Sequence, residues 1–271
     1  MTLKDAEERL AEAGIDSPEW DAREIYYHAT RDERHRLIDK TADIQNPIFE
    51  KLVELRCMRE PLQYILGEAF FFREKYFVNP DVLIPRQDTE HLVEYAIKNI
   101  PDGEFFLDLC TGSGCIAISV LNNTLNTEAL AVDISKKALE VAYKNAHDIG
   151  VASRIDFAEC DLMQSFPVCK KRPYAILSNP PYVTSEAYGS LAPEIYREPK
   201  TAFVAEDGGM AFYKRLLPLS LDLINPAGFV AFEIGYDQEK KICELANELF
   251  AAVEIIKDYS GNARVAVITR K

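Results

Sequence analysis

Residues 178–184, SNPPYVT, combine an amide, two consecutive prolines and an aromatic ring at the end of a short apolar run, residues 174–177. The apolar run is typical of a buried strand, and two successive prolines forbid a helix and stiffen the loop. The side-chain oxygen of Asn179 and the carbonyl of Pro180 can accept the two N–H donors of a planar amide or amine, and the ring of Tyr182 can stack on its flat face. The loop therefore predicts a site for a substrate nitrogen, formed by Asn179, Pro180, Pro181 and Tyr182.

A second loop has the composition of a ligand-binding turn. The stretch FFLDLCTGSGCIAI, residues 105–118, predicts a strand, then Gly112 and Gly114, then a helix. In open α/β sheets ligands bind at the carboxyl ends of strands, and glycines let the backbone approach the ligand and free the helix N-terminus for it. A dinucleotide fingerprint is met only in its looser form, because Ala117 stands where a third glycine would be. A tight turn without a ligand is the alternative for this motif alone.

Three aspartates at the ends of three successive predicted strands favour a nucleoside ligand without phosphates. Asp108 precedes the glycines, where a carboxylate is poorly placed beside a pyrophosphate but suits an amino group. Asp133 ends the next strand, about 20 residues further on, where a carboxylate can bind ribose hydroxyls. Asp161 follows the third strand and could accept a hydrogen bond from an adenine amino group. S-Adenosyl-L-methionine combines these features, so the sequence predicts it as the cofactor.

Together the two loops predict methyl transfer to nitrogen. The proline-rich loop would hold the substrate nitrogen towards the methyl group on sulfur, and the two oxygens would stabilise the positive charge that grows on nitrogen as the methyl moves. The prolines fix these acceptors before the substrate docks. We therefore expect Asn179, Pro180 and Tyr182 to be the catalytic residues. No metal is expected, because a sulfonium is already a good leaving group and departs as S-adenosyl-L-homocysteine.

The elements around these loops predict a Rossmann-like α/β domain. From residue 104 strands and helices alternate, which implies a parallel sheet with helices on both faces. The last two strands are joined by the short turn GNAR and should be antiparallel, which gives a mixed sheet. A helix capped by Asp88 or Thr89 and running to about residue 99 precedes them. The predicted strands are 104–110, 128–134, 154–160, 174–178, 228–234, 251–260 and 264–271, and the later helices are 113–123, 135–150 (capped by Ser135), 209–224 and 237–250.

The first part of the chain predicts a small helical bundle. Short helices are expected at residues 3–13, 18–30, 31–38 and 47–58. The last of these places Ile48, Leu52 and Leu55 on one face. A β-hairpin from about 67 to 84, with its turn near 73–75, should follow. We therefore divide the chain into a helical bundle at 1–66, a β-hairpin linker at 67–86 and a methyltransferase domain at 87–271.

The composition excludes several classes of protein. The chain has 271 residues, and 31 basic against 44 acidic residues give a net charge of −13. Proteins that grip duplex DNA cluster Lys and Arg, so we expect no direct nucleic-acid footprint. No apolar stretch reaches the roughly 18 residues of a membrane-spanning helix, and the first residues carry no signal region, so we expect neither membrane contact nor secretion. Six cysteines without metal-site spacing indicate reduced thiols in the cytoplasm. The absence of a coiled-coil seam favours a monomer.

The same motifs resemble the class I S-adenosylmethionine-dependent methyltransferases with an N-P-P-Y motif. More closely, the chain resembles the PrmC/HemK family, the protein-(glutamine-N5) methyltransferases that modify peptide chain release factors. The resemblance covers nearly the whole chain and rests on PLQYILGEAFFF, VLIPRQDTEHLVE, LDLCTGSGCIAIS, AVDISKKALEVAYKNA, SNPPYV, EPKTAF, DGGMAFYKRLL, FEIGYDQ and DYSGNARVAV. The glycine loop alone is moderately specific, whereas IPRQDTE together with N-P-P-Y is highly specific.

This resemblance implies a fold and a substrate. The fold is an N-terminal helical bundle joined by a β-hairpin to a seven-stranded methyltransferase domain. The substrate is the glutamine of the GGQ motif in class 1 peptide chain release factors, methylated on its side-chain amide nitrogen (N5), and the bundle helps to hold the release factor. The resemblance places the cofactor contacts at Cys110, Thr111, Gly112, Ser113, Gly114, Asp133, Leu162 and Asn179.

Three positions depart from the family pattern. Cys110 replaces the first glycine of D-L-G-T-G-S-G, and we expect a modest effect if its φ angle is negative. Gln87 replaces a proline beside the cofactor pocket, which removes a backbone constraint. Residues 204–209, VAEDGG, stand where the family has a glycine pair before D-G, so the sequence leaves the role of this segment open.

Other functions would use some of the same features. An adenine-N6 DNA or RNA methyltransferase would present an exocyclic amine to the same acceptors, but it would need base extrusion and a cationic groove. The net charge of −13 and the lack of a separate target-recognition domain count against it. An NAD-dependent oxidoreductase is disfavoured by the aspartate before the glycines and by the proline loop. A non-catalytic binding module would not need both the carboxylates and N-P-P-Y.

Overall fold

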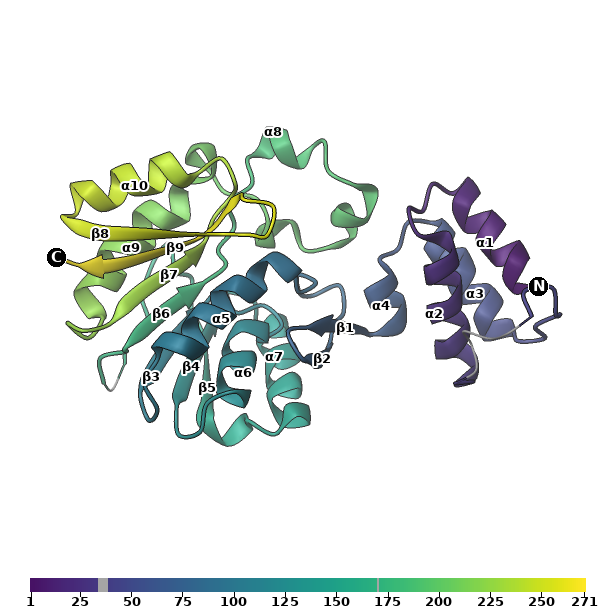
Figure 1. The fold of residues 1–271 in the computed structure, drawn as a ribbon, viewed down its shortest axis with the longest axis horizontal. Helices are drawn as coiled ribbons and strands as arrows, with labels where there is room; N and C mark the ends of the chain where they lie inside the picture. Colours follow the sequence, from purple (N-terminus) through teal and green to yellow (C-terminus); the bar gives the residue numbers. More distant parts are fainter. Residues whose placement is uncertain (34–38, 170) are drawn as a thin grey trace. The chain divides into compact units, whose positions relative to one another are not determined.

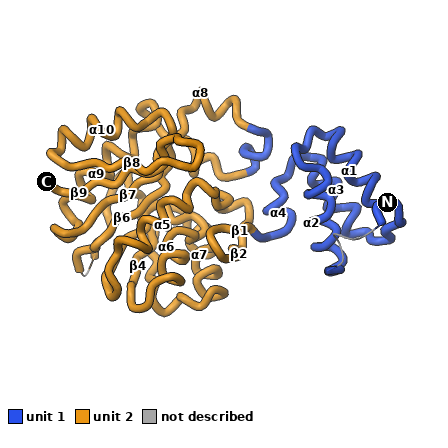
Figure 2. The backbone as a smooth tube through the Cα atoms, viewed as in Figure 1, with its two compact units in different colours: residues 1–68, 192–197 blue, residues 69–191, 198–271 orange. Residues whose placement is uncertain are grey.

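The computed structural model describes residues 1–33, 39–169 and 171–271 (Figure 1). The chain forms two compact units (Figure 2). Unit 1 comprises Met1–Glu68 and Ala192–Arg197, and unit 2 comprises Ala69–Leu191 and Glu198–Lys271. The helix predicted at 31–38 falls mostly outside the described residues. Within the described ranges, no helix is long and apolar enough to cross a membrane.

Unit 1 is built from short helices. α1 (Leu3–Glu12), α2 (Pro18–Thr30) and α3 (Pro47–Cys57) match predicted helices, whereas α4 (Leu62–Leu66) is an additional single turn. A capping box begins α1: the Thr2 hydroxyl accepts from the N–H of Asp5, and the Asp5 carboxylate accepts from the N–H of Thr2. Leu3, Ala6 and Leu10, which recur at helical spacing in α1, are all buried.

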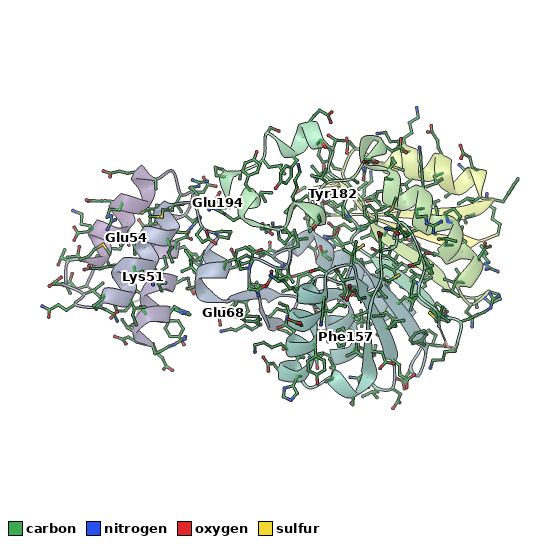
Figure 3. The ribbon with its side chains drawn as sticks, turned by 180° about the vertical axis from the view of Figure 1, so that it is seen from behind. Lys51, Glu54, Glu68, Phe157, Tyr182 and Glu194 are labelled. Carbon is green, nitrogen blue, oxygen red and sulfur yellow. The ribbon has the colours of Figure 1, made fainter. Side chains whose placement is uncertain are left out.

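The predicted apolar face of α3 is only partly right, because Leu52 packs against the core of unit 1 but Ile48 does not. Ile48 is 57% exposed, and the helix instead buries Phe49, Val53 and Arg56. Arg56 is buried because it lies between two carboxylates of unit 1, 2.7 Å from that of Asp21 and 2.9 Å from that of Glu194. Figure 3 labels Glu194, which lies in the segment 192–197 of unit 1. A buried arginine is tolerated only when its charge is paired, and no apolar periodicity can predict that pairing.

The β-hairpin is shorter than predicted. β1 (Glu68–Phe71) and β2 (Glu74–Phe77) form a separate two-stranded sheet that ends at Phe77, not near residue 84. The chain turns at Asn79, whose side-chain oxygen accepts from the N–H of Asp81 at 3.0 Å. Pro80 between them cannot donate to a ladder, so β2 cannot continue.

Seven strands form one mixed sheet in unit 2 (Figure 1). Their spatial order is β5 (Ile155–Glu159), β4 (Glu128–Asp133), β3 (Phe105–Leu109), β6 (Ala175–Ser178), β7 (Phe229–Glu233), β9 (Ala263–Arg270) and β8 (Ala251–Lys257). The first five are parallel, and β9 runs antiparallel to both β7 and β8. The predicted Rossmann-like mixed sheet is confirmed, including its antiparallel last pair.

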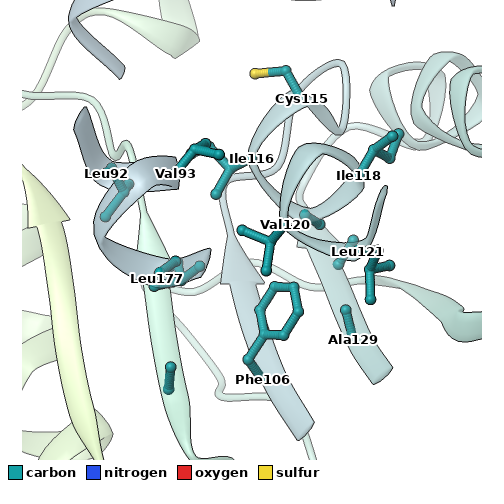
Figure 4. Close-up of a cluster of buried hydrophobic side chains, with 14 of the residues drawn as sticks. Leu92, Val93, Phe106, Cys115, Ile116, Ile118, Val120, Leu121, Ala129 and Leu177 are labelled. Atoms are coloured by element: carbon teal, nitrogen blue, oxygen red, sulfur yellow. The ribbon is translucent and has the colours of Figure 1, made fainter. Parts of the chain in front are cut away.

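Different helices cover the two faces of this sheet. Phe106 and Leu177 point to the face covered by α5 (Glu90–Asn99), α6 (Cys115–Asn122) and α7 (Lys136–Ile149), where they pack with Val93, Ile116 and Val120 (Figure 4). Leu107 and Ile176, one residue away in each strand, point to the face covered by α9 (Ala211–Leu223) and α10 (Glu239–Glu248). Both cores are apolar, as a parallel sheet buried on both faces requires.

The start of α5 differs from the sequence prediction in one respect. A 3₁₀ turn, η1 (Gln87–Thr89), precedes the helix, and Thr89 occupies the N-cap position. The Thr89 hydroxyl does not cap the helix, because it donates to the carboxylate of Glu233 instead. In contrast, Ser135 caps α7 as predicted, since its hydroxyl oxygen accepts from the N–H of Ala138 at 3.2 Å.

Candidate active site

The order of the strands brings the two predicted loops together. The chain runs from β3 outward through β4 to β5 and then returns to place β6 on the other side of β3. This is the topological switch point, where ligands bind in open α/β sheets. Leu109 and Ser178 are register partners at the carboxyl ends of β3 and β6, and the Ser178 hydroxyl donates to the Leu109 carbonyl at 2.5 Å. The glycine loop and the N-P-P-Y loop therefore begin side by side.

A pocket opens where these loops meet. Its empty volume, including the space open to solvent at its mouth, is about 760 Å³. Residues 81–83 and Phe212 add to its wall. Of the predicted site residues, it is lined by Cys110, Gly112, Asp133, Asp161, Leu162, Asn179 and Pro181. The others are placed differently: Asp108, Thr111, Ser113 and Pro180 are buried, Gly114 is the N-cap of α6, and Tyr182 is partly buried.

The glycine loop is tied to β4 through Asp133. One carboxylate oxygen of Asp133 accepts from the N–H of Gly112 and the other from the N–H of Ser135, each at 2.9 Å. Burial raises the pKa of Asp133, while these backbone hydrogen bonds lower it. Gly114 must be a glycine: its φ is +82°, and a Cβ there would lie 2.7 Å from the Cδ1 of Ile118. The same Cβ would lie 3.1 Å from the Cβ of Ala142, so a glycine here lets the start of α6 pack closely against α7.

Asp108 lies fully buried at the end of β3. Its Oδ2 accepts from the Thr111 hydroxyl at 2.6 Å and from the N–H of Ala117 at 3.2 Å. Its Oδ1 is buried and has no hydrogen-bond partner among the described residues. Burial raises the pKa of Asp108 to about 7. A buried acceptor without a partner is costly in a folded protein, and a donor group of a ligand would satisfy it.

A modest effect of Cys110 in place of glycine was predicted only for a negative φ angle, and this condition is not met. The φ of Cys110 is +60°, in the left-handed region, not at a negative value. A residue with a Cβ costs roughly 1–2 kcal/mol in that conformation. Its thiol is not a candidate nucleophile, because burial raises its pKa well above that of an ordinary cysteine.

Asp161 lines the pocket from the loop after β5. Its Oδ1 accepts from the N–H of Met163 at 3.0 Å and its Oδ2 from the side-chain nitrogen of Gln164 at 2.5 Å. These local bonds fix the carboxylate in its loop. Each carboxylate oxygen has a second lone pair, so both can accept from a ligand as well.

The N-P-P-Y loop holds two hydrogen-bond acceptors, the Asn179 side-chain oxygen and the Pro180 carbonyl. The side-chain nitrogen of Asn179 donates to the Thr89 hydroxyl at 3.2 Å, so the amide oxygen is the atom left for a ligand. Within the described residues, neither this oxygen nor the Pro180 carbonyl takes part in a hydrogen bond. The Tyr182 hydroxyl donates to Glu233 at 3.2 Å, and burial raises its pKa.

Sequence reasoning missed two groups that shape this site. Glu233 is only 3% exposed and contacts both Thr89 and Tyr182, and the signal for it was a carboxylate between Phe232 and Ile234 in an apolar strand. Glu198 is 5% exposed, accepts from the N–H of Ile84 at 2.9 Å and pairs with Arg86. Glu198 thereby ties the segment after the hairpin to the segment that begins at Pro199, and both segments supply pocket residues.

Two family descriptions match the chain, and one of them is a methyltransferase domain. The family described as methyltransferase small domain matches residues 87–213, and the PrmC N-terminal domain matches residues 2–67. The ribosomal protein L11 methylase of Lactobacillus delbrueckii subsp. bulgaricus shares the fold, with a TM-score of 0.52 and 22% identity over 72% of this chain and 84% of that one.

Curated relatives define the family more closely. The release factor glutamine methyltransferase of Bacillus subtilis is 35% identical over 97% of this chain and 94% of its own length. That of Moorella thermoacetica is 32% identical over 100% of this chain and 98% of its own length. The chain belongs to the family of release factor glutamine methyltransferases.

Proposed function

We propose that this protein transfers a methyl group from S-adenosyl-L-methionine to the side-chain amide nitrogen of the glutamine in the GGQ motif of class 1 peptide chain release factors. The observation that carries this proposal is the pair of unused acceptors in the N-P-P-Y loop. The Asn179 side-chain oxygen and the Pro180 carbonyl have no partner in the described part of the chain, while the Asn179 nitrogen is held by Thr89. A primary amide has two N–H donors, which this pair would accept.

The residues that line the pocket and those buried beside it fit this cofactor. Asp133 would bind the ribose hydroxyls, and Asp161 would accept from the adenine amino group. The unpartnered Oδ1 of buried Asp108 suits an amino group better than a phosphate. Thr111, Gly112, Ser113 and Gly114 would let the backbone approach the ligand, with Cys110 and Leu162 beside it. When bound, the cofactor supplies a methyl carbon on a sulfonium, and S-adenosyl-L-homocysteine leaves.

The loop after β6 would position the glutamine. Asn179 and Pro180 accept its two N–H groups, Pro181 stiffens the turn, and Tyr182 contacts the planar amide. In the transfer, an N–C bond would form as the S–C bond breaks, and one amide proton would then be released to solvent. The two oxygens stabilise the positive charge on nitrogen before that proton leaves.

The larger organisation follows from this reaction. Residues 1–66 would contact the release factor, residues 67–86 would link, and residues 87–271 would carry the chemistry. The substrate is a translation protein, so we place the reaction in the cytoplasm. The net charge of −13 suits a basic protein partner better than a nucleic acid, and a monomer suffices for the site.

The proposal is tested with radiolabelled S-adenosyl-L-methionine and three acceptors: a purified class 1 release factor, the same factor with the GGQ glutamine replaced by alanine, and DNA. Label is expected only on the unmodified factor. Label on DNA and none on the factor would instead favour the nucleic-acid alternative, the adenine-N6 methyltransferase. Equal labelling of the two factors would place the methyl group elsewhere on the protein.

A further inference from the structure

A buried carboxylate joins the two side chains proposed to contact the substrate. Glu233 is the last residue of β7 and is 3% exposed. One of its oxygens accepts from the Tyr182 hydroxyl at 3.2 Å, and the other accepts from the Thr89 hydroxyl. Thr89, itself 2% exposed, accepts in turn from the side-chain nitrogen of Asn179 at 3.2 Å. The order of donors runs from Asn179 to Thr89 to Glu233, and from Tyr182 to Glu233.

This order decides which atom of Asn179 faces the substrate. The oxygen and nitrogen of an amide occupy nearly the same space, so shape alone does not fix its orientation. A threonine hydroxyl has one proton, and here that proton goes to Glu233. Thr89 can then only accept from Asn179, which places the amide nitrogen towards Thr89 and leaves the oxygen for the substrate.

We propose that Glu233 is a positioning residue that, through Thr89, presents the side-chain oxygen of Asn179 to the substrate nitrogen and, through the Tyr182 hydroxyl, holds the ring beside it. This inference rests on the proposed function and adds two residues to the site. Neither of them touches the reacting atoms, so neither is catalytic in itself.

The surroundings of Glu233 argue against a purely structural role. Its neighbours in the strand, Phe232 and Ile234, are fully buried apolar residues, and an apolar side chain at 233 would avoid the cost of burying a carboxylate. Burial raises the pKa of Glu233 to about 7, while the hydrogen bonds from Thr89 and Tyr182 lower it. The ionisable groups that face or influence it are Asp88, Cys115, Tyr182, Tyr213 and Arg264. Tyr213 donates to the main-chain carbonyl of Glu233 at 2.8 Å, so it leaves the carboxylate to Thr89 and Tyr182.

The first test replaces Thr89 by valine, which keeps the shape and removes the hydroxyl. The value of kcat for release-factor methylation should fall by about tenfold or more, because a misplaced reacting group costs up to about 100-fold. The cofactor Kd, measured by calorimetry, should change by less than about threefold, since Thr89 is not a pocket residue. Thr89→Ser restores the hydroxyl and should recover at least half of the lost kcat on a logarithmic scale.

Thr127→Val is the matched control. Thr127 is also fully buried, but its hydroxyl has no hydrogen-bond partner among the described residues. It precedes β4, at the opposite end of the strand from Asp133, so its replacement should leave kcat within about twofold of the parent value. An equal loss of kcat in Thr127→Val and Thr89→Val would overturn the inference, because any buried threonine would then matter alike.

Glu233→Gln separates positioning from stability. A glutamine cannot accept from both hydroxyls through two carboxylate oxygens, so kcat should fall by about tenfold. At pH 8 it removes a buried charge, so the unfolding midpoint should stay unchanged or rise. If Glu233 had only a structural role, Glu233→Gln would lower both kcat and the unfolding midpoint. A fall in the midpoint equal to that of a core truncation would therefore reject the positioning role.

The two proposals can fail separately. If the parent enzyme labels no release factor, the proposed function fails, whatever the variants do. If the parent is active and Thr89→Val and Glu233→Gln both match its kcat, the function stands and the positioning role is rejected.

Discussion

Gly209 lies directly against the main chain of Tyr182. A Cβ built on Gly209 would lie 2.2 Å from the Tyr182 carbonyl oxygen, and the φ angle of Gly209 is +83°. The same carbonyl accepts from the side-chain nitrogen of Gln238 at 3.3 Å. The role of the segment 204–209, which the sequence left open, thus includes packing behind the N-P-P-Y loop.

Gly209→Ala should therefore disturb both stability and catalysis. We expect the free energy of unfolding to fall by about 1–3 kcal/mol beyond the cost of the φ angle, because the loop must move away from the new methyl group. Denaturant unfolding measures the first effect and release-factor methylation the second. Gly261→Ala is the control, since Gly261 has a φ of +86° but nothing within 4 Å of its Cβ position. Equal losses at the two glycines would show that the contact with Tyr182 costs nothing.

Asn179→Ala should separate binding from transfer. The variant loses an acceptor for the substrate nitrogen but keeps the carboxylates of the pocket, so methyl transfer should fall by at least about 100-fold. The cofactor Kd from calorimetry should change much less than the transfer rate, by no more than about tenfold, because Asn179 is one of several residues that line the pocket. Asn122→Ala, on an exposed residue that donates to Glu74, should behave like the parent. Transfer at the parent rate by Asn179→Ala would refute the proposed orientation of the substrate.

Asp108→Asn should raise the stability of the protein at high pH and weaken its affinity for the cofactor. Burial raises the pKa of Asp108 from 3.8 to about 7. Above pH 7 the carboxylate is ionised in both the folded and the unfolded parent, and the buried charge lowers the free energy of unfolding. At pH 8 the variant should unfold with a free energy at least about 1 kcal/mol higher than the parent. The difference should shrink as the pH falls from 7 towards 4, because the folded parent then binds a proton.

The same variant should bind the cofactor about tenfold more weakly, since a neutral amide replaces the carboxylate beside the proposed amino group. Calorimetry and denaturation at pH 8 and pH 5 measure both effects. Asp156→Asn, at an exposed position in β5, provides the comparison. A stability difference that is the same at both pH values would contradict the assignment to Asp108.

Cys110→Gly should be more stable than Cys110→Val, because the two residues differ in how well they fit the left-handed region. Glycine adopts a φ of +60° without strain, so Cys110→Gly should gain roughly 1 kcal/mol in the free energy of unfolding. The lost packing of the thiol offsets part of this gain. Valine is β-branched and fits the left-handed region worst, so it should be at least about 2 kcal/mol less stable than the glycine variant. Thermal unfolding of the three proteins side by side tests this, and equal midpoints for glycine and valine would argue against the left-handed conformation.

The sequence predicted the elements of unit 2 well because local signals agreed with the fold. The strand before Asp108, the Ser135 cap and the apolar run before Asn179 each carried a periodicity or a capping residue that tertiary contacts did not override. The class of site followed from the same places, because carboxyl ends of neighbouring parallel strands converge.

What the sequence could not predict depends on contacts between distant residues. The sequence predicted Thr89 as a helix cap, but its hydroxyl donates a hydrogen bond to Glu233, 144 residues away, instead. Arg56 interrupted an apolar pattern in α3 because Asp21 and Glu194 surround it. The conformation of Cys110 is a backbone property that residue type makes improbable, so only the structure reveals it.

The assignment of Ala192–Arg197 to unit 1 limits how the protein can be dissected. The chain passes from one unit to the other after residues 68, 191 and 197, so no single cut yields both units whole. A fragment starting at residue 69 would carry Glu194 without Arg56 and Arg59, its partners at 2.9 and 2.8 Å. The complementary fragment, ending at residue 68, would keep a buried arginine with one of its two carboxylates missing. Experiments on isolated halves would thus compare damaged proteins, whereas point substitutions elsewhere keep the ion pairs of Glu194 with Arg56 and Arg59.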